Sequence, residues 1–234
     1  SRDFSRLFQY ISAALGPLFE NRGRRSFQGG YLTEIFTDRG IQFLERHRSR
    51  PFFLHMAYNS VHTLVHEVPD RYVRKFGLKP IPKYDPKTMG KYVDYYDRYA
   101  QLGVISTKEM RQYYLANLAC LDDQIGRLLD ALDRLRLAGN TLIVFSSDNG
   151  GTHVSNEPLR GKKGGYYEGG IRVPMVVRWP GVVAPGSTCD VPVLNVDFYP
   201  TFLAVAGAAG PASPLDGESL LPLFQGKNKL QRQS

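Results

Sequence analysis

The stretch that decides the fold is TLIVFSSDNGG, residues 141–151. Its first six residues form a run of mostly apolar, β-branched side chains without alternation, which is typical of a strand covered on both faces. The polar residues that follow predict a turn where the strand ends. In open α/β sheets, ligands bind beyond the carboxyl ends of the strands, so Asp148 and Asn149 lie where a binding site is expected.

A long amphipathic helix is predicted just before this strand, across residues 107–138. Ser106 followed by Glu109 is a capping-box pattern for its start, and Gly139 with Asn140 predicts a left-handed stop. The apolar residues of the helix recur at steps of three and four, which puts them on one stripe facing a core: Tyr114, Leu118, Leu121, Ile125, Leu128, Leu132 and Leu135.

Further apolar runs alternate with helical patterns along the chain. One spans residues 51–58 and follows an amphipathic helix over about residues 31–47. Another spans residues 173–179, where Pro174 restricts the first positions to a strand start or an edge. A fourth, short strand is predicted over residues 191–196, before another helix. This alternation predicts the α/β class, with a mainly parallel sheet sandwiched by helices.

Length and composition narrow the class of protein. The 234 residues, 42% hydrophobic and 22% charged, can bury the core of one large domain or two small ones. No apolar run approaches the about 20 residues that a membrane helix needs, and no apolar leader follows Ser1. The net charge of +8 suggests an anionic partner, but the positive residues are scattered and show no nucleic-acid-binding motif. Nucleic acid is therefore not predicted as a partner.

The two cysteines, Cys120 and Cys189, are too few for a disulfide framework or a cysteine-based zinc site. We interpret them as a packed helix residue and a loop thiol.

Several polar residues near the strand ends are candidates for chemistry. Asp148 and Asn149 suit a hard cation such as Ca²⁺ or Mg²⁺, although an Asp-Asn-Gly turn explains the same residues. Since Ca²⁺ takes about 6 to 8 oxygens, this pair is not a whole site. His62 follows the run at 51–58 and either donates a hydrogen bond or proton to an anionic group or simply bonds a nearby carbonyl. His66 comes without the H-E-x-x-H pattern, so no zinc site is predicted.

A glycine-rich loop, LRGKKGGYYEGGIRVP, occupies residues 159–174. Five glycines between residues 161 and 170 let the backbone approach a ligand closely, and Lys162 and Lys163 add positive charge. The loop lacks the Walker A pattern. The alternative is a glycine-rich hairpin with solvated lysines.

Taken together and in this order, the motifs resemble the type I sulfatase family of the alkaline phosphatase superfamily. The resemblance runs from about residue 31 to residue 226. The stretches that carry it are PFFL at 51–54, VHT at 61–63, LDDQIG at 121–126, SDNGG at 147–151, PLRG at 158–161, YEGGIRVP at 167–174, DFYPT at 197–201 and DGESLLP at 216–222.

The resemblance implies an alkaline-phosphatase-like α/β fold and hydrolysis of sulfuric esters, either aryl sulfates or sulfated carbohydrates. The family uses a formylglycine nucleophile and Ca²⁺. On this basis Asp148 and Asn149 are metal ligands, His62 contacts the sulfate and Lys163 neutralises it. Lys162 stands where the family usually has glycine, which adds a second positive charge. The family's tendency toward export implies a periplasmic or extracellular location.

One departure from the family concerns the nucleophile. Neither C-x-P-S-R nor S-x-P-S-R occurs in the sequence, since Cys120 precedes LDDQ and Cys189 precedes DVPV. The family's first acidic pair of calcium ligands has no match either. We hypothesise that the chain is the central and C-proximal part of a sulfatase, with the formylglycine in an N-terminal part, and that alone it is inactive.

This hypothesis gives a domain division. Residues 1–207 belong to the catalytic domain, with a Tyr-rich surface insertion at 78–106, and residues 208–234 form a domain edge and the start of a C-terminal region. Two other functions remain open. A phosphodiesterase or phosphonate monoester hydrolase of the same superfamily would use the same Ca²⁺, His and Lys set, and a noncatalytic protein would bind sulfated glycans through its basic surface.

Overall fold

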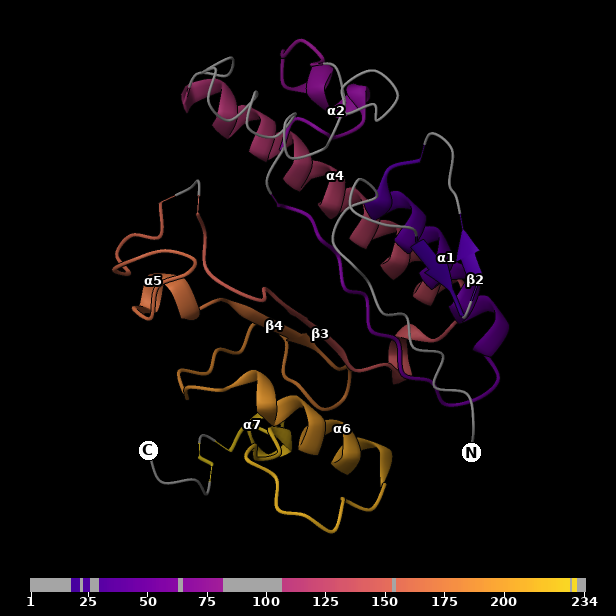
Figure 1. Cartoon of the computed structure of the whole chain (residues 1–234). Helices are drawn as coiled ribbons and strands as arrows, with labels where there is room; N and C mark the ends of the chain where they lie inside the picture. The colour runs from indigo at the N-terminus through magenta and orange to yellow at the C-terminus, as the bar shows by residue number, and fades with distance from the viewer. Residues whose placement is uncertain are drawn as a thin grey trace. The chain divides into compact units, whose positions relative to one another are not determined.

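The computed structural model divides the chain into two compact units, Ser1–Arg136 (unit 1) and Leu137–Ser234 (unit 2) (Figure 1). It describes residues 18–21, 23–25, 30–62, 65–81, 107–152, 155–227 and 229–230. Most of the surface insertion predicted over 78–106, and the capping residue Ser106, lie outside these residues.

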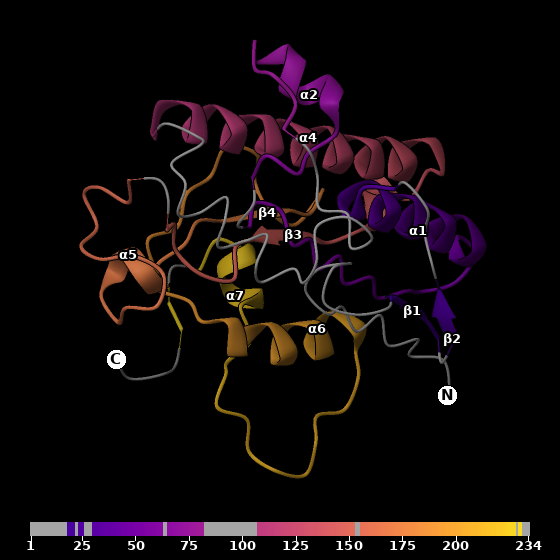
Figure 2. The same ribbon diagram turned by 45° about the horizontal axis from the view of Figure 1, so that its top comes forward.

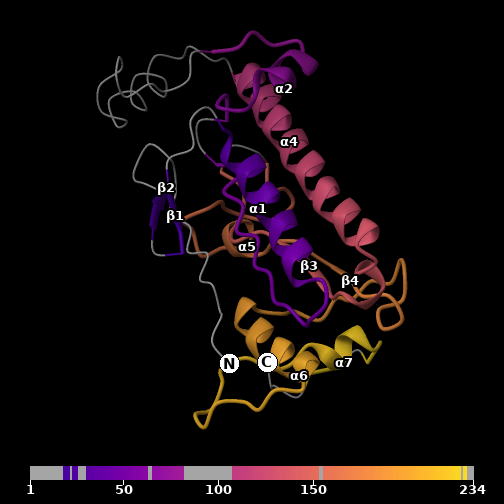
Figure 3. The same cartoon turned by 90° about the vertical axis from the view of Figure 1, so that its right-hand side faces the viewer.

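Unit 1 is built on two helices that lie side by side, α1 (Leu32–His47) and α4 (Thr107–Arg134) (Figures 1 and 3). The helix predicted over 31–47 is therefore confirmed. Gly40 lets the helices come close, because a Cβ there would lie 2.9 Å from the sulfur of Met56 and 3.2 Å from Leu128. A short helix, α2 (Asp70–Lys75), packs on α4, and β1 (Leu18–Glu20) pairs with β2 (Gly23–Arg25) in antiparallel register.

The buried face of α4 differs from the predicted stripe. Leu121 and Leu132 are buried as expected, but Leu118 is 40% exposed. Near α2 the helix instead buries Tyr113, Ala116 and Cys120, which share a core cluster with α2. The face of α4 that is buried here is therefore the one in contact with α2, and it includes two small side chains.

The end of α4 also comes earlier than predicted. The helix stops at Arg134, and Arg136 takes the left-handed conformation with φ of 59°, whereas Gly139 lies in a short 3-10 helix, η1 (Ala138–Asn140).

The strand predicted over 51–58 runs without secondary structure in the described part of unit 1, although exposure alternates along it as in a strand. Hydroxyl contacts attach its end to α1. Tyr58 lies 2.7 Å from the Thr37 hydroxyl, and Ser60 lies 2.6 Å from the Thr33 hydroxyl. These contacts hold the segment that leads to His62.

Unit 2 contains the strands β3 (Ile143–Ser146) and β4 (Met175–Arg178), which confirm the predicted runs at 141–146 and 173–179 in shorter form. Pro174 precedes β4, as its missing N–H requires. Helices and strands alternate here as the α/β class predicts, but β3 and β4 pair antiparallel, with Ile143 opposite Arg178. Among the described strands no parallel pair occurs, because the connection from β3 to β4 is a loop with one short helix, α5 (Glu168–Ile171), rather than a covering crossover helix.

The prediction of a fourth strand over residues 191–196 is wrong. This stretch runs into a 3-10 helix, η2 (Asn195–Asp197). Pro192 has no N–H to donate to a sheet, and the N–H of Leu194 donates instead to the Asp197 carboxylate at 2.8 Å.

The remaining helices of unit 2, α6 (Phe198–Ala206) and α7 (Leu221–Phe224), lie on one side of the β3–β4 pair (Figure 2). Their core includes Leu220 and Phe224, with Met175, Val177 and Trp179 packed against it.

Two buried side chains tie residues 216–222 to the start of α6. The Asp197 carboxylate accepts hydrogen bonds from the backbone N–H groups of Leu194 at 2.8 Å and Glu218 at 2.9 Å. The Thr201 hydroxyl accepts from Leu220 N–H at 2.8 Å and donates to the Asp197 carbonyl at 2.6 Å. The motifs DFYPT and DGESLLP are therefore held together by buried hydrogen bonds.

We predict that Asp197→Ala destabilises unit 2 by about 2–4 kcal/mol, because two backbone N–H groups lose their buried acceptor. Asp197→Asn, which keeps one acceptor oxygen, should cost less. Trp179 is the chain's single tryptophan and lies in this core, so its fluorescence in a urea titration reports the loss. Asp190→Ala, at an exposed site, is the control. Equal midpoints for all variants would contradict the account.

The environment of Cys120 predicts its reactivity. Its side chain is fully buried, and burial raises the pKa of the thiol to about 12, whereas Cys189 is exposed. Because the thiolate is the reactive form, iodoacetamide at about pH 8 should alkylate one cysteine per folded chain and both in urea, as read by mass spectrometry. Rapid double alkylation of the folded chain would show that the α2–α4 core is open.

Candidate functional site

The turn after β3 places the first two candidate residues. Asp148 is exposed and Asn149 is half-buried. The Ser147 hydroxyl donates to the Asn149 carbonyl at 2.9 Å, and the Ser146 hydroxyl donates to the Pro174 carbonyl at 3.2 Å. The serines thus fasten the turn to the end of the strand pair, and the carboxylate of Asp148 faces solvent.

The backbone of this turn touches the glycine-rich loop. The N–H of Gly150 donates to the Gly170 carbonyl at 3.0 Å. A Cβ at Gly150 would overlap the Gly169 carbonyl, and a Cβ at Gly169 would overlap the carbonyls of Gly161 and Arg160. Glycine is required at these positions because no side chain fits between the two segments.

Lys163 is held against the same turn through its backbone. Its N–H donates to the Gly151 carbonyl at 3.2 Å, and the N–H of Gly165 donates to the Lys162 carbonyl at 2.9 Å. Gly161 has a φ of 87°, a conformation that side chains rarely adopt. Both lysines are exposed. The structure therefore brings the segments of Asp148, Asn149 and Lys163 together within unit 2.

Two charged contacts stiffen the same loop. The Arg160 guanidinium lies 3.8 Å from the centre of the Tyr167 ring, and Arg172 pairs with Glu168 at 3.2 Å. Asn156, which no motif in the sequence indicated, binds both segments with its side-chain amide.

His62 belongs to unit 1, where its side chain is exposed. His66 is 3% exposed, and its ring centre lies 6.4 Å from that of Tyr113 in the core beside α2.

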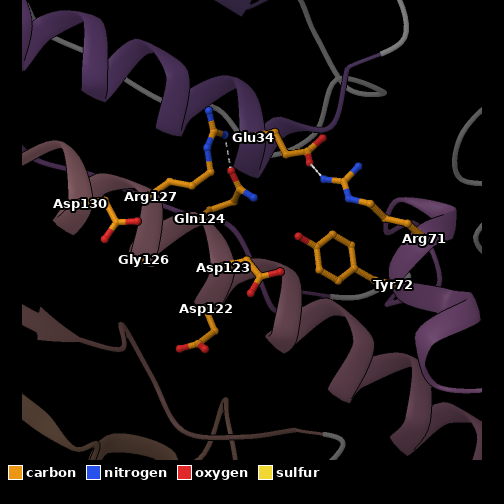
Figure 4. A pocket seen from close by; sticks show the side chains of 9 residues that line it. All are labelled: Glu34, Arg71, Tyr72, Asp122, Asp123, Gln124, Gly126, Arg127 and Asp130. Atoms are coloured by element: carbon orange, nitrogen blue, oxygen red, sulfur yellow. Dashed lines mark hydrogen bonds and ion pairs between the residues drawn. The ribbon is translucent and has the colours of Figure 1, made fainter.

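Unit 1 also has a polar pocket of about 590 Å³ between α1, α2 and α4 (Figure 4). Its lining consists of Glu34, Arg71, Tyr72, Asp122, Asp123, Gln124, Gly126, Arg127 and Asp130. Glu34 pairs with Arg71, and the buried Gln124 accepts from Arg127 at 2.7 Å. The motif LDDQIG contributes carboxylates to this pocket, and these would repel an anionic ester.

The donor set of unit 2 fits a hard cation in part. A carboxylate and an amide oxygen are the ligand types that Ca²⁺ takes, but a pair supplies only part of its shell. In the ranges that the structure describes, no cluster of three or more His, Cys, Asp or Glu residues could hold a metal ion. No helix in those ranges is both long and apolar enough to span a bilayer.

Comparisons with known proteins agree with the motifs. A sulfatase family model matches residues 3–208. The chain is 34% identical to human steryl-sulfatase over 211 residues, which are 85% of this chain and 30% of that protein. The crystal structure of Ps i-CgsB in complex with k-i-k-neocarrahexaose is 32% identical with a TM-score of 0.72, covering 91% of this chain and 42% of that one.

A phosphonate monoester hydrolase from Silicibacter pomeroyi, 21% identical with a TM-score of 0.59, shares the fold alone; it covers 87% of this chain and 43% of that one. These solved structures confirm the predicted α/β fold. The chain spans about a third of the length of the curated relatives it matches, 30% of one and 39% of another. Since the family model covers most of the residues, the chain belongs to the sulfatase family.

Proposed function

We propose that this chain carries the sulfate- and calcium-binding part of a sulfuric ester hydrolase. The observation that supports this most strongly is the contact between the turn of Asp148 and the loop of Lys163, where the Lys163 N–H lies 3.2 Å from the Gly151 carbonyl. This contact holds the backbone segment that carries two oxygen-bearing side chains against the segment that carries a cationic side chain. An anionic ester is bound by positive charge, which Lys163 would supply directly and the two oxygen donors would supply through a bound cation.

In this proposal Asp148 and Asn149 hold Ca²⁺ through side-chain oxygens. When bound, Ca²⁺ supplies positive charge to the oxygens of the ester group. Lys163 adds a cationic donor to the same group, and its glycine neighbours let the backbone follow the ligand closely. His62 donates a hydrogen bond to the ester, either to a sulfate oxygen or to the leaving oxygen.

The substrate that we propose is an aryl sulfate or a sulfated carbohydrate. The solved relative with a bound neocarrahexaose, at 32% identity, supports the carbohydrate. We further propose a location in the periplasm or outside the cell, and a catalytic domain that includes residues 1–207.

Binding of Ca²⁺ and inorganic sulfate tests the role of each residue. Equilibrium dialysis with radiolabelled ions should give Ca²⁺ affinity on the order of millimolar for a partial oxygen shell, and sulfate binding that depends on Ca²⁺. Asp148→Asn should weaken Ca²⁺ binding about tenfold, with exposed Asp190→Asn unchanged. Lys163→Ala should weaken sulfate binding about tenfold, whereas Lys162→Ala should change it less than about threefold.

Each other outcome favours an alternative. If Lys162→Ala weakens sulfate binding more than Lys163→Ala does, Lys162 is the lysine that binds sulfate. Tighter binding of phosphate than of sulfate would favour a phosphoester or phosphonate hydrolase. Heparin binding that survives both Lys163→Ala and chelator would favour a noncatalytic glycan-binding protein.

Turnover is a separate prediction. Residues 1–234 contain neither C-x-P-S-R nor S-x-P-S-R, the pattern from which sulfatases make their nucleophile. We therefore expect the 234-residue chain to bind a chromogenic aryl sulfate without hydrolysing it above the rate of a Lys163→Ala control. Release of product well above this control would overturn the assignment of the nucleophile.

A further inference from the structure

We propose that Asn156 is a positioning residue that fixes the turn of Asp148 and Asn149 against the loop of Lys163. This inference rests on the proposed function for its consequence, since it explains how a metal turn and an anion-binding lysine keep one arrangement.

The Asn156 side chain makes three hydrogen bonds to backbone atoms of both segments. Its Nδ2 donates to the Gly151 carbonyl at 2.9 Å and to the Gly161 carbonyl at 3.1 Å. Its Oδ1 accepts from the Gly151 N–H at 3.0 Å. Gly151 ends the turn that carries Asp148 and Asn149, and Gly161 precedes the two lysines, so one side chain bridges the two segments.

The chemistry of the amide assigns this residue to positioning rather than to binding. Both hydrogens of Nδ2 are engaged, and only a second lone pair on Oδ1 remains. That lone pair would repel an anionic oxygen. Asn156 therefore acts on the ester only through the groups that it holds.

Both backbone polar groups of Gly151 are hydrogen-bonded in this arrangement. Its carbonyl accepts from both Asn156 Nδ2 and the Lys163 N–H, while its N–H donates to Asn156 Oδ1. Loss of the amide would remove the bonds that Asn156 makes to Gly151 and Gly161, so the bond of 3.2 Å from the Lys163 N–H to the Gly151 carbonyl would lose this support. The position of Lys163 relative to Asp148 would then vary.

Amide hydrogen exchange, followed by NMR on the ligand-free chain, tests the bridge itself. Asn156→Ala should speed exchange of the Gly151 and Lys163 amides about tenfold, the effect of losing one net hydrogen bond. Asn156→Asp keeps an acceptor for Gly151, so the Gly151 amide should stay protected while that of Lys163 exchanges faster. Ser155→Ala, whose hydroxyl accepts from the Glu157 N–H at 3.2 Å, is the matched control and should change neither.

Protection of the β3 amides in each variant shows that unit 2 still folds. Unchanged exchange at Gly151 and Lys163 in a folded Asn156→Ala chain would overturn the bridge.

Sulfate affinity at saturating Ca²⁺ tests the positioning role. Asn156→Ala should weaken binding about tenfold in the wild-type background, but hardly at all when Lys163→Ala is already present. Equal effects in both backgrounds would show a general loss of structure and overturn the role. The exchange data alone decide whether the bridge exists. If the variants show the expected exchange pattern but the wild-type chain binds no sulfate, the bridge stands and the proposed function is contradicted.

Discussion

The backbone of Gly150 approaches Gly170 so closely that no side chain fits between the two segments, and the candidate site of unit 2 depends on this approach. The Gly150 N–H donates to the Gly170 carbonyl at 3.0 Å, and the Lys163 N–H donates to the Gly151 carbonyl at 3.2 Å. A turn that offers oxygen ligands and a loop that offers a cation thereby become one surface. Glycines in both segments are what make the contact sterically possible.

The family motifs serve two different physical purposes. The motifs around Asp148 and Lys163 place exposed charged groups, whereas Asp197 and Thr201 are fully buried and bond backbone N–H groups. The first kind suits a ligand, and the second keeps residues 216–222 against α6. The LDDQIG motif combines both features, with Gln124 buried and its neighbouring carboxylates at a polar pocket in unit 1.

Sequence patterns predicted the helices well because apolar periodicity reflects burial, and α1 follows the predicted range to within a residue. They failed where contacts with another segment of the chain determine burial or secondary structure. Near α2 the helix α4 buries Ala116 and Cys120 while Leu118 is exposed, and the Asp197 carboxylate accepts from the Leu194 N–H within the strand predicted over 191–196. Glycines and charged residues revealed the candidate site, but Asn156 was missed because its partners are backbone atoms, which leave no pattern in the sequence.

The most direct test of the account is an NMR map of the chain titrated with Ca²⁺ and then with inorganic sulfate. We expect Ca²⁺ to shift the amides of Asp148 and Asn149, and sulfate then to shift those of Lys163 and its glycine neighbours in the same concentration range. Sulfate shifts confined to Arg46, Arg48 and Arg50 at the end of α1, with no response to Ca²⁺ at Asp148, would contradict this assignment.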